Sequence, residues 1–156
     1  MSVADPIPLV TVGEKVAMIV SPQVDRVWKR FRQNAADSKE ACGVLVGGYS
    51  SDHGTIFIEK CTQPGKRDWR QRFGFILKSC HHQRVLDLAF RNSTGTQFYL
   101  GTWHTHPCAH PQPSGEDKRD WAKCMKRNPG FEFFVFAIVG TASALLTIYR
   151  GTVDGK

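Results

Sequence analysis

Three side chains that commonly bind metal ions lie in the stretch GTWHTHPCAHPQPSGEDKRDW, residues 101–121. His104 and His106 are two residues apart, so in a β-strand both imidazoles point to the same face and can approach one ion. Asp117 adds a carboxylate after a proline-rich loop. Zinc held by two histidines and a carboxylate keeps a fourth position for water, whose pKa it lowers to about 7. The expected chemistry is attack of water on an amide.

Each of these residues also has a purely structural explanation. A strand can carry two histidines for packing or hydrogen bonding, so an HxH pattern alone is weak support for a metal site. Ser114 followed by Asp117 matches the capping box that begins many helices. Both roles of Asp117 are compatible, because a helix amino terminus is fixed in space and favours a carboxylate in its first turn. The combination of strand end, rigid loop and helix start therefore favours the metal site.

Hydrolysis of an amide also needs a group that takes a proton from water and returns it to the leaving amine. Glu40 stands immediately before the apolar segment CGVLVGG, at a strand edge where a side chain can overhang a site. Glu59 is expected in the middle of a strand, Glu116 lies next to the candidate ligand, and Glu14 belongs to the amino-terminal leader. Four glutamates are therefore candidates, and only Glu40 is expected at a strand edge.

The spacing of apolar residues predicts the elements that position these side chains. Short apolar or alternating segments predict strands, and apolar residues three and four apart predict helices. The resulting order indicates an α/β fold with a central mixed β-sheet flanked by about three helices. The helix over 79–93 is expected to bury Val85, Leu86, Ala89 and Phe90 and to expose His82. The expected strands are 16–20, 42–50, 54–61, 71–77, 97–106, 131–140 and 144–151, and the expected helices are 22–36, 79–93 and 114–128.

Length and composition indicate the class of protein. A chain of 156 residues, 41% of them hydrophobic, suits a single domain over residues 1–156, with loosely held ends at about 1–12 and 151–156. No basic segment precedes an apolar one near the amino terminus, and no window approaches the ~18 apolar residues of a membrane helix. We therefore expect a cytoplasmic protein with no membrane partner. Five cysteines without a CxxC pair predict reduced thiols.

The formal net charge of +7 could attract nucleic acid, an acidic protein surface or anionic lipid. Basic residues are densest in GKRDWRQR, residues 65–72, which we interpret as the solvated rim of a hairpin. Trp69 in this run would suit base stacking, but one aromatic residue is a weak indication of single-strand binding. A zinc deaminase would need HxE and PCxxC motifs, which the sequence lacks. A basic nucleic-acid-binding protein is thus the less favoured alternative.

The motifs together resemble those of a known family. HTHP, six further residues and SGED fit the pattern H-[ST]-H-P-x6-S-x-x-D, and EACGVLVGG supplies a glutamate before a glycine-rich apolar strand. The sequence thereby resembles the JAMM (MPN+) zinc metalloproteases over roughly residues 16–149. The segments TQPGKRDWRQRFGF, HHQRVLDLAFRNSTG and YLGTWHTHP look like the prokaryotic JAB branch. That branch includes deconjugases of CBASS (CD-NTase-associated) and of bacterial ubiquitin-like modification operons.

The resemblance implies a fold, a cofactor and a reaction. The fold would be a single JAMM/MPN-like domain of cytidine-deaminase-like architecture, and the cofactor one zinc ion with a bound water. The reaction would be hydrolysis of the peptide or isopeptide bond after the carboxy-terminal residue of a ubiquitin-like protein or similarly conjugated protein. By this resemblance the metal ligands would be His104, His106 and Asp117, the general acid/base Glu40, and the donor to the oxyanion Ser114.

The same resemblance implies partners and one further alternative. The partners would be the ubiquitin-like or C-terminally conjugated protein and its target, recognised by short loops such as 47–54 and 63–72, because the sequence has no long insertion. A catalytically silent MPN-type scaffold would normally have lost a metal ligand or the glutamate. This sequence retains every one of these residues, which favours the enzyme.

Overall fold

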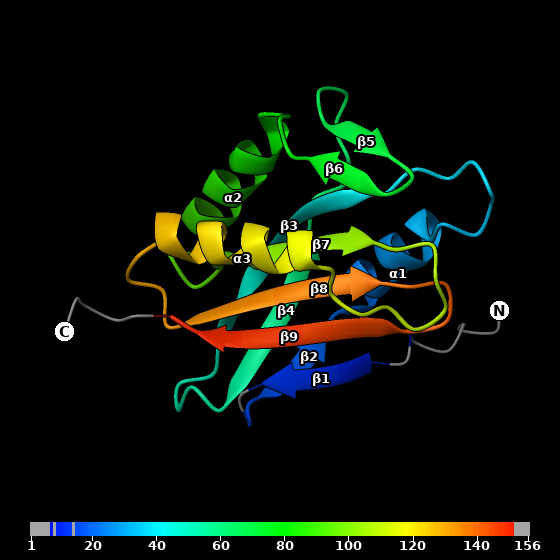
Figure 1. Cartoon of the computed structure of the whole chain (residues 1–156). Helices are drawn as coiled ribbons and strands as arrows, with labels where there is room; N and C mark the ends of the chain where they lie inside the picture. Colours follow the sequence, from blue (N-terminus) through cyan, green and yellow to red (C-terminus); the bar gives the residue numbers. More distant parts are fainter. Residues whose placement is uncertain (1–6, 8, 14, 152–156) are drawn as a thin grey trace, which may run out of the picture.

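A seven-stranded mixed sheet forms the centre of the computed structural model, which describes residues 7, 9–13 and 15–151. Its strand order is β1-β9-β8-β7-β3-β4-β2, and a separate two-stranded hairpin, β5–β6, stands beside it (Figure 1). The strands are β1 Leu9–Gly13, β2 Ala17–Val20, β3 Cys42–Tyr49, β4 Thr55–Cys61, β5 Trp69–Gln71, β6 Gly74–Ile76, β7 Phe98–Thr105, β8 Phe133–Val139 and β9 Ala144–Arg150, and the helices are α1 Pro22–Phe31, α2 His81–Asn92 and α3 Gly115–Arg127.

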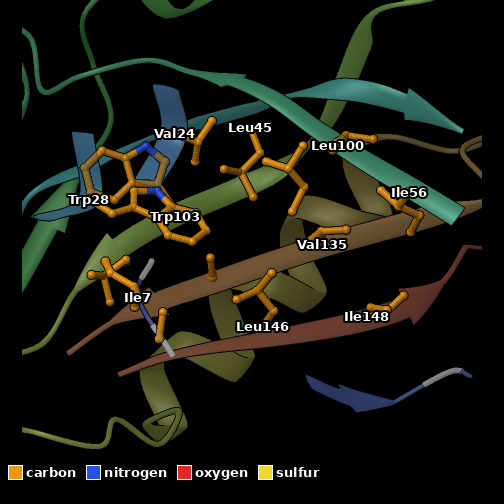
Figure 2. Packing of buried hydrophobic residues seen from close by; sticks show 14 of the residues in the cluster. Ile7, Val24, Trp28, Leu45, Ile56, Leu100, Trp103, Val135, Leu146 and Ile148 are labelled. Carbon is orange, nitrogen blue, oxygen red and sulfur yellow. The ribbon is translucent and has the colours of Figure 1, made fainter. Parts of the chain in front are cut away.

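Helix α1 covers one face of the sheet. Its Val24 and Trp28 are fully buried and pack against a cluster that includes Leu45 of β3 and Trp103 of β7. Figure 2 shows the two indole rings next to each other over the strands. Burial of this apolar stripe accounts for the amphipathic spacing of the helix. Other members of this cluster are Ile7, Ile56, Leu100, Val135, Leu146 and Ile148.

Helices α2 and α3 cover the opposite face. Trp121 of α3 stacks on Phe136 of β8 with ring centroids 4.9 Å apart, and Ala89 of α2 packs against Val44 and Val46 of β3. Since alternate residues of β8 point to opposite faces and both faces are covered, all of its residues are buried. Figure 1 shows α2 and α3 on the near side of the sheet and α1 behind it. The predicted α/β class, with a mixed sheet and three helices, is confirmed.

A register shift in β7 sets which of its side chains face α2 and α3. Opposite Leu45 and Val46 of β3, the β7 partner changes from Gly101 to Tyr99, so Leu100 is an extra residue. Leu100 joins the α1 cluster, while Tyr99 packs against the clusters on the other face. Gly101 has a φ of +154°, and a Cβ there would lie 1.8 Å from a backbone oxygen of β8, so the position needs glycine.

The segment 71–77, expected to be one strand of the central sheet, is instead part of a separate hairpin. β5 and β6 pair antiparallel, with Trp69 opposite Ile76 and Arg70 opposite Phe75. Residues 72 and 73 form the turn between them. Such two-residue turns usually contain asparagine or glycine, and this one is Arg-Phe, so the sequence does not mark it. The basic run therefore contains a strand of this hairpin.

The expected helix over 22–36 ends earlier, at Phe31. Arg32 has extended backbone angles, with φ −52° and ψ 138°. The next residue, Gln33, is buried, and its side-chain amide donates to the carbonyl oxygens of Ser38 and Arg72. Helix α1 thus stops where the chain turns to bring Gln33 into a buried network.

Helix α2 buries a different set of side chains from the one expected. Ala89 is buried and Val85 and Leu86 are half-buried, as predicted. Phe90 is 53% exposed, so the prediction of its burial is wrong. His82, expected at the surface, is only 6% exposed because both of its ring nitrogens form hydrogen bonds inside the protein.

Part of the amino-terminal segment expected to be loosely held is paired. Strand β1 runs parallel to β9, and the backbone N–H of buried Ile7 donates to Asp25 at 2.8 Å. The expectation is therefore wrong for residues 7 and 9–12, because the edge of β9 offers backbone groups that need partners. It is also wrong for Gly151, whose backbone N–H donates to the carbonyl of Glu132 at 2.7 Å, and the other expected loose residues, 1–6, 8 and 152–156, lie outside the described part of the chain. Within that part, no helix has the length and apolar character needed to span a membrane.

Candidate metal centre and its cavity

The end of β7 and the start of α3 bring together the two histidines and the aspartate. His104 Nε2 lies 3.1 Å from His106 Nε2 and 3.1 Å from Asp117 Oδ1, and His106 Nε2 lies 3.2 Å from Asp117 Oδ2. One ligand atom from each residue falls within 4.8 Å of the others. Figure 1 shows the β7 arrowhead beside the first turn of α3, with the β5–β6 hairpin next to them.

These separations fit a metal ion. Three donor atoms around zinc at about 2.0 Å in a tetrahedral site lie about 3.3 Å from one another. The two imidazole nitrogens are 3.1 Å apart, close to that value, and each has a different oxygen of Asp117 at 3.1 or 3.2 Å. Two imidazole nitrogens and a carboxylate are also donors that zinc accepts. The residues present therefore fit a metal ion such as zinc.

Local structure fixes Asp117 in this position. The backbone N–H of Ser114 donates to Asp117 Oδ2 at 2.8 Å, and the backbone N–H of Asp117 donates to Ser114 Oγ at 3.0 Å, which is the expected capping box. Burial alone would raise the pKa of Asp117, but hydrogen bonds from His104, His106 and the Ser114 backbone hold the pKa well below its usual range. The carboxylate is therefore charged and ready to bind a cation.

His104 is the most buried of the three residues, at 1% exposed. Its burial lowers its pKa, which favours the neutral imidazole that metal binding requires. The ring of Phe75, from β6, lies 4.9 Å from the His104 ring, centroid to centroid. Nδ1 of His104 is buried and has no hydrogen-bond partner among the described residues. The hairpin thus closes the site over the inner histidine.

Glu40 lies across the β3–β7 ladder from His106. Cys42 pairs with His104, and the backbone N–H of Thr105 donates to the carbonyl of Ala41, so the same register places Glu40 opposite His106. Directly opposed residues point to the same face of a sheet. Glu40 is 5% exposed, and burial, followed by the negative charges of the nearby acids, raises its pKa to about 8. A bound cation would act in the opposite direction.

The β5–β6 hairpin holds the backbone of Glu40 on both sides of the residue. The N–H of Glu40 donates to the carbonyl of Gln71 at 2.7 Å, and Arg70 Nε donates to the carbonyl of Glu40 at 2.6 Å. The sequence interpretation of this basic run as a solvated rim is therefore wrong for Arg70, which is half-buried. Its role could not be found from charge density, because only the fold shows that it reaches the glutamate.

A second buried network connects the glutamate to the histidine strand. Thr105, between the two histidines, donates its hydroxyl to Gln33 Oε1 at 2.9 Å and accepts the backbone N–H of Ala41 at 2.8 Å. The side-chain amide of Gln33 in turn donates to the carbonyl oxygen of Ser38, two residues before Glu40, and to that of Arg72, directly after β5. The two histidines and the glutamate are therefore positioned by one set of hydrogen bonds, in which Gln33 is a residue that the sequence did not single out.

A cavity of about 340 Å³ opens beside the three candidate ligands. The acidic residues lining it are Glu40, Glu116, Asp117 and Asp120, and it also includes His106 and Ser114. Of the other glutamates considered, Glu59 is in the middle of β4 and outside this cavity, and Glu14 lies outside the described residues. The remaining lining residues are Phe73, Gly74, Phe75, Pro107 and Cys108.

Comparison with known proteins identifies relatives over most of the chain. Residues 24–150 match the family described as prokaryotic homologs of the JAB domain, a range that includes all five candidate site residues. A CD-NTase/cGAS isopeptidase of Pseudomonas aeruginosa is 35% identical over 130 residues, which cover 81% of this chain and 80% of the relative. A probable metalloprotease of Sinorhizobium fredii is 36% identical over 73 residues, 46% of this chain and 44% of the relative.

Two further relatives share the name CD-NTase/cGAS isopeptidase. The one from Vibrio cholerae is 38% identical over 93 residues, and the match covers 60% of this chain and 58% of the relative. The one from Escherichia coli is 38% identical over 104 residues, 67% of this chain and 65% of the relative. A solution structure from Desulfitobacterium hafniense covers 89% of this chain and 94% of its own with a TM-score of 0.55 and 18% identity, which shows a shared fold.

Proposed function

The chain belongs to the family of prokaryotic homologs of the JAB domain, as its motifs predicted, and from this membership we propose that it is a zinc-dependent isopeptidase. The bond hydrolysed is the peptide or isopeptide bond after the carboxy-terminal residue of a ubiquitin-like protein or similarly conjugated protein. The relatives named CD-NTase/cGAS isopeptidase support a CD-NTase as the conjugated protein and a CBASS operon as the setting. The cytoplasmic location stays a prediction.

The observation that carries this proposal is the convergence of three metal-binding atoms at the edge of a cavity that His106, Asp117 and the buried Glu40 line. His104, His106 and Asp117 would hold zinc. When bound, zinc supplies Lewis-acid polarisation of the scissile carbonyl and a more acidic water. A silent scaffold would not need the glutamate, and here its backbone is hydrogen-bonded to the hairpin at both its N–H and its carbonyl.

Glu40 carries the proton in this mechanism. Burial raises the pKa of Glu40 and a bound cation would lower it, so the carboxylate can take a proton from water and give it up again. The protonated acid then donates to the leaving amine. Glu40 lines the cavity and its backbone is fixed by Gln71 and Arg70, so the carboxyl group is held beside the place where the amide nitrogen departs.

Ser114 supports the negative charge that develops on the carbonyl oxygen. Its Oγ accepts the N–H of Asp117, which leaves the hydroxyl proton free to donate into the cavity that Ser114 lines. A donor that is already positioned is worth most as the oxyanion forms. Ser114 therefore serves both as the cap of α3 and as a hydrogen-bond donor to the substrate.

A fusion assay tests the proposal. A CD-NTase and a bacterial ubiquitin-like protein are each joined through the carboxy-terminal residue to a fluorescent reporter and incubated with the zinc-loaded protein. We expect a single cut directly after that residue, located by mass spectrometry, that a chelator abolishes and added zinc restores. If a protein with one zinc per chain leaves both fusions intact, the proposed function is wrong.

A further inference from the structure

A groove leads away from the candidate metal centre between the β6–α2 segment and α3. A cavity of about 400 Å³ begins at His104 and Asp117, and a larger one of about 860 Å³ continues it along α2. Four residues line both cavities, which makes them adjoining parts of one groove. These shared residues are Val44, Leu77, Tyr99 and Asn128.

The position of Glu40 assigns one part of the substrate to this groove. On the proposed function, Glu40 donates a proton to the leaving amine, so the amine departs on the side where Glu40 lies. Glu40 lines the cavity of about 340 Å³ and does not line the groove, whose nearest wall contains His104. The residues that precede the scissile bond, which form the tail of the conjugated protein and supply the carbonyl group, therefore occupy the groove.

Charge along the groove changes sign with distance from the metal centre. Asp120 lines the part next to Asp117, whereas Lys123 and Arg127 line the part beyond it on the same helix. Lys78 lines the distal cavity from the opposite wall. All three cations are exposed, and within the described residues their side chains form no ion pair or hydrogen bond. Lys123 and Arg127 therefore face the middle of the groove, and Lys78 faces its distal part.

Two acids, Glu132 and Asp87, also line the distal cavity. Glu132 pairs with His53 and with Arg150, whereas Asp87 keeps its charge while it accepts a hydrogen bond from the neutral Gln83, so three cations outnumber the one acid that has no ion pair among the described residues. Acids near the start of α3 and bases near its end also complement the helix dipole, which by itself would explain the order of charges on the helix. The dipole does not explain Lys78, which lies outside the helix and faces the same groove.

We propose that the groove selects conjugated proteins whose tail carries an acidic side chain three to five residues before the scissile bond, bound by Lys123, Arg127 and Lys78. The spacing follows from helix geometry. At 1.5 Å per residue, Lys123 lies about 9 Å and Arg127 about 15 Å along α3 from Asp117, which an extended tail at about 3.3 Å per residue covers in about three to five residues. The inference rests on the proposed function and deepens it by defining the substrate.

The experiment compares short fluorescent peptide amides that end in a reporter amine. A single Glu is moved along the peptide one residue at a time, and Lys replaces it in a matched series. Cleavage by the zinc-loaded protein gives kcat/KM, and fluorescence anisotropy with Glu40→Gln gives binding. Glu should be favoured over Lys by about threefold to tenfold at the distal positions, less so at high salt, and disfavoured next to the scissile bond because Asp120 lies there.

Two adjacent residues of α3 provide matched variants. Arg127 lines the groove and Lys126 does not, yet both are exposed in the last turn and carry the same charge. Arg127→Glu should remove or reverse the preference for Glu, and Lys126→Glu should retain it. Because both changes alter net charge and helix dipole equally, the difference between them reports the groove alone.

The outcomes separate this inference from the proposed function. Cleavage without a preference for Glu, or equal loss of the preference in both variants, overturns the inference and leaves the function in place. Charge-dependent binding without cleavage supports the inference and overturns the function. Peptides that are neither bound nor cleaved overturn both.

Discussion

Two aspartates of this protein face buried histidines, and their surroundings differ in how completely hydrogen bonds are made. Asp68 accepts the N–H of His82 Nε2 at 2.7 Å and the backbone N–H groups of Gly65, Lys78 and Ser79 at 2.7 to 2.8 Å. Burial alone would raise the pKa of Asp68, but these donors hold it well below its usual range. Every polar atom of the carboxylate therefore has a protein partner.

The histidine facing Asp68 is also fully paired. The charged Asp68 carboxylate can only accept, so His82 Nε2 carries the proton of the neutral ring. The Thr62 hydroxyl therefore donates to His82 Nδ1 at 2.6 Å, while Thr62 Oγ1 accepts the backbone N–H of Val44 at 2.8 Å. Donors and acceptors alternate from the β3 backbone to the carboxylate, and a cation would have no free lone pair to bind.

Asp117 lacks this complete pairing. It receives one backbone N–H, and two imidazole nitrogens face both it and each other at 3.1 to 3.2 Å. Three potential metal-binding groups thus converge on one point beside a cavity, and a bound cation would displace the protons that the imidazoles share with the carboxylate. A buried histidine–aspartate contact thus indicates a metal site when several metal-binding atoms converge on one point. It indicates a structural hydrogen bond when hydrogen-bond donors and acceptors alternate.

Changing each aspartate separately to asparagine is the strongest test of this difference. Asp117→Asn should lose the metal, from one per chain toward none by elemental analysis, and hydrolysis should fall by about a thousandfold or more, because zinc contributes several kcal/mol to the transition state. Asp68→Asn should keep stoichiometric metal. Equal metal loss in both variants would show that Asp117 is not specifically a ligand.

Glu40→Gln separates metal binding from proton transfer within the metal centre. Metal content should stay at one per chain, while kcat falls by about a hundredfold to ten thousandfold, because the amide of glutamine cannot accept and return the proton. Unchanged backbone bonds from the hairpin keep the residue in place. Hydrolysis by Glu40→Gln at the wild-type rate would contradict this role.

The paired aspartate should instead affect stability. Asp68→Asn is expected to lower the free energy of unfolding by about 2 to 4 kcal/mol at neutral pH, measured by urea denaturation, because it leaves buried donors without a charged acceptor. Since the folded-state pKa of Asp68 is depressed, its stabilisation is present above the unfolded pKa of about 3.9 and is lost as the pH falls. The difference from wild type should therefore shrink below about pH 4.

The exposed residue Asp37 provides the control for that measurement. Asp37→Asn makes the same chemical change at the surface and should alter the free energy of unfolding by less than about 0.5 kcal/mol. If both variants are equally stable, the Asp68 network contributes nothing to the fold.

The convergence of the three candidate ligands was predictable because they are local in sequence. His104, His106 and Asp117 lie at the end of one strand and the start of the next helix, and period-two geometry and capping chemistry describe both elements. The site role of Glu40 came from the resemblance to a family. The β3–β7 register that sets it opposite His106 depends on pairing between distant segments, which the sequence alone does not specify.

The β5–β6 hairpin and the burial of His82 were not predictable, because both depend on contacts between segments that are distant in sequence. Residues 71–77 read as one strand because the turn at 72–73 lacks asparagine or glycine, so the hairpin that holds Glu40 went unrecognised. His82 follows the pattern of an exposed first turn, and its burial depends on Asp68 and Thr62, distant in sequence. The strand and helix pattern, by contrast, predicted the α/β class correctly, since both faces of β8 needed cover.

Thr62→Val is expected to have the smallest effect, and it tests which ring nitrogen of His82 carries the proton in the Asp68 network. Thr62→Val removes the partner of His82 Nδ1 and of the Val44 N–H, so the free energy of unfolding should fall by about 1 to 2 kcal/mol with metal content and hydrolysis unchanged. Nitrogen NMR of the histidine should still show the Nε2–H form, because Asp68 continues to accept that proton. A change to the Nδ1–H form would mean that Thr62, not the aspartate, sets the tautomer. The contrast with Asp117 would then rest on a hydroxyl group rather than on a complete set of donors around a carboxylate.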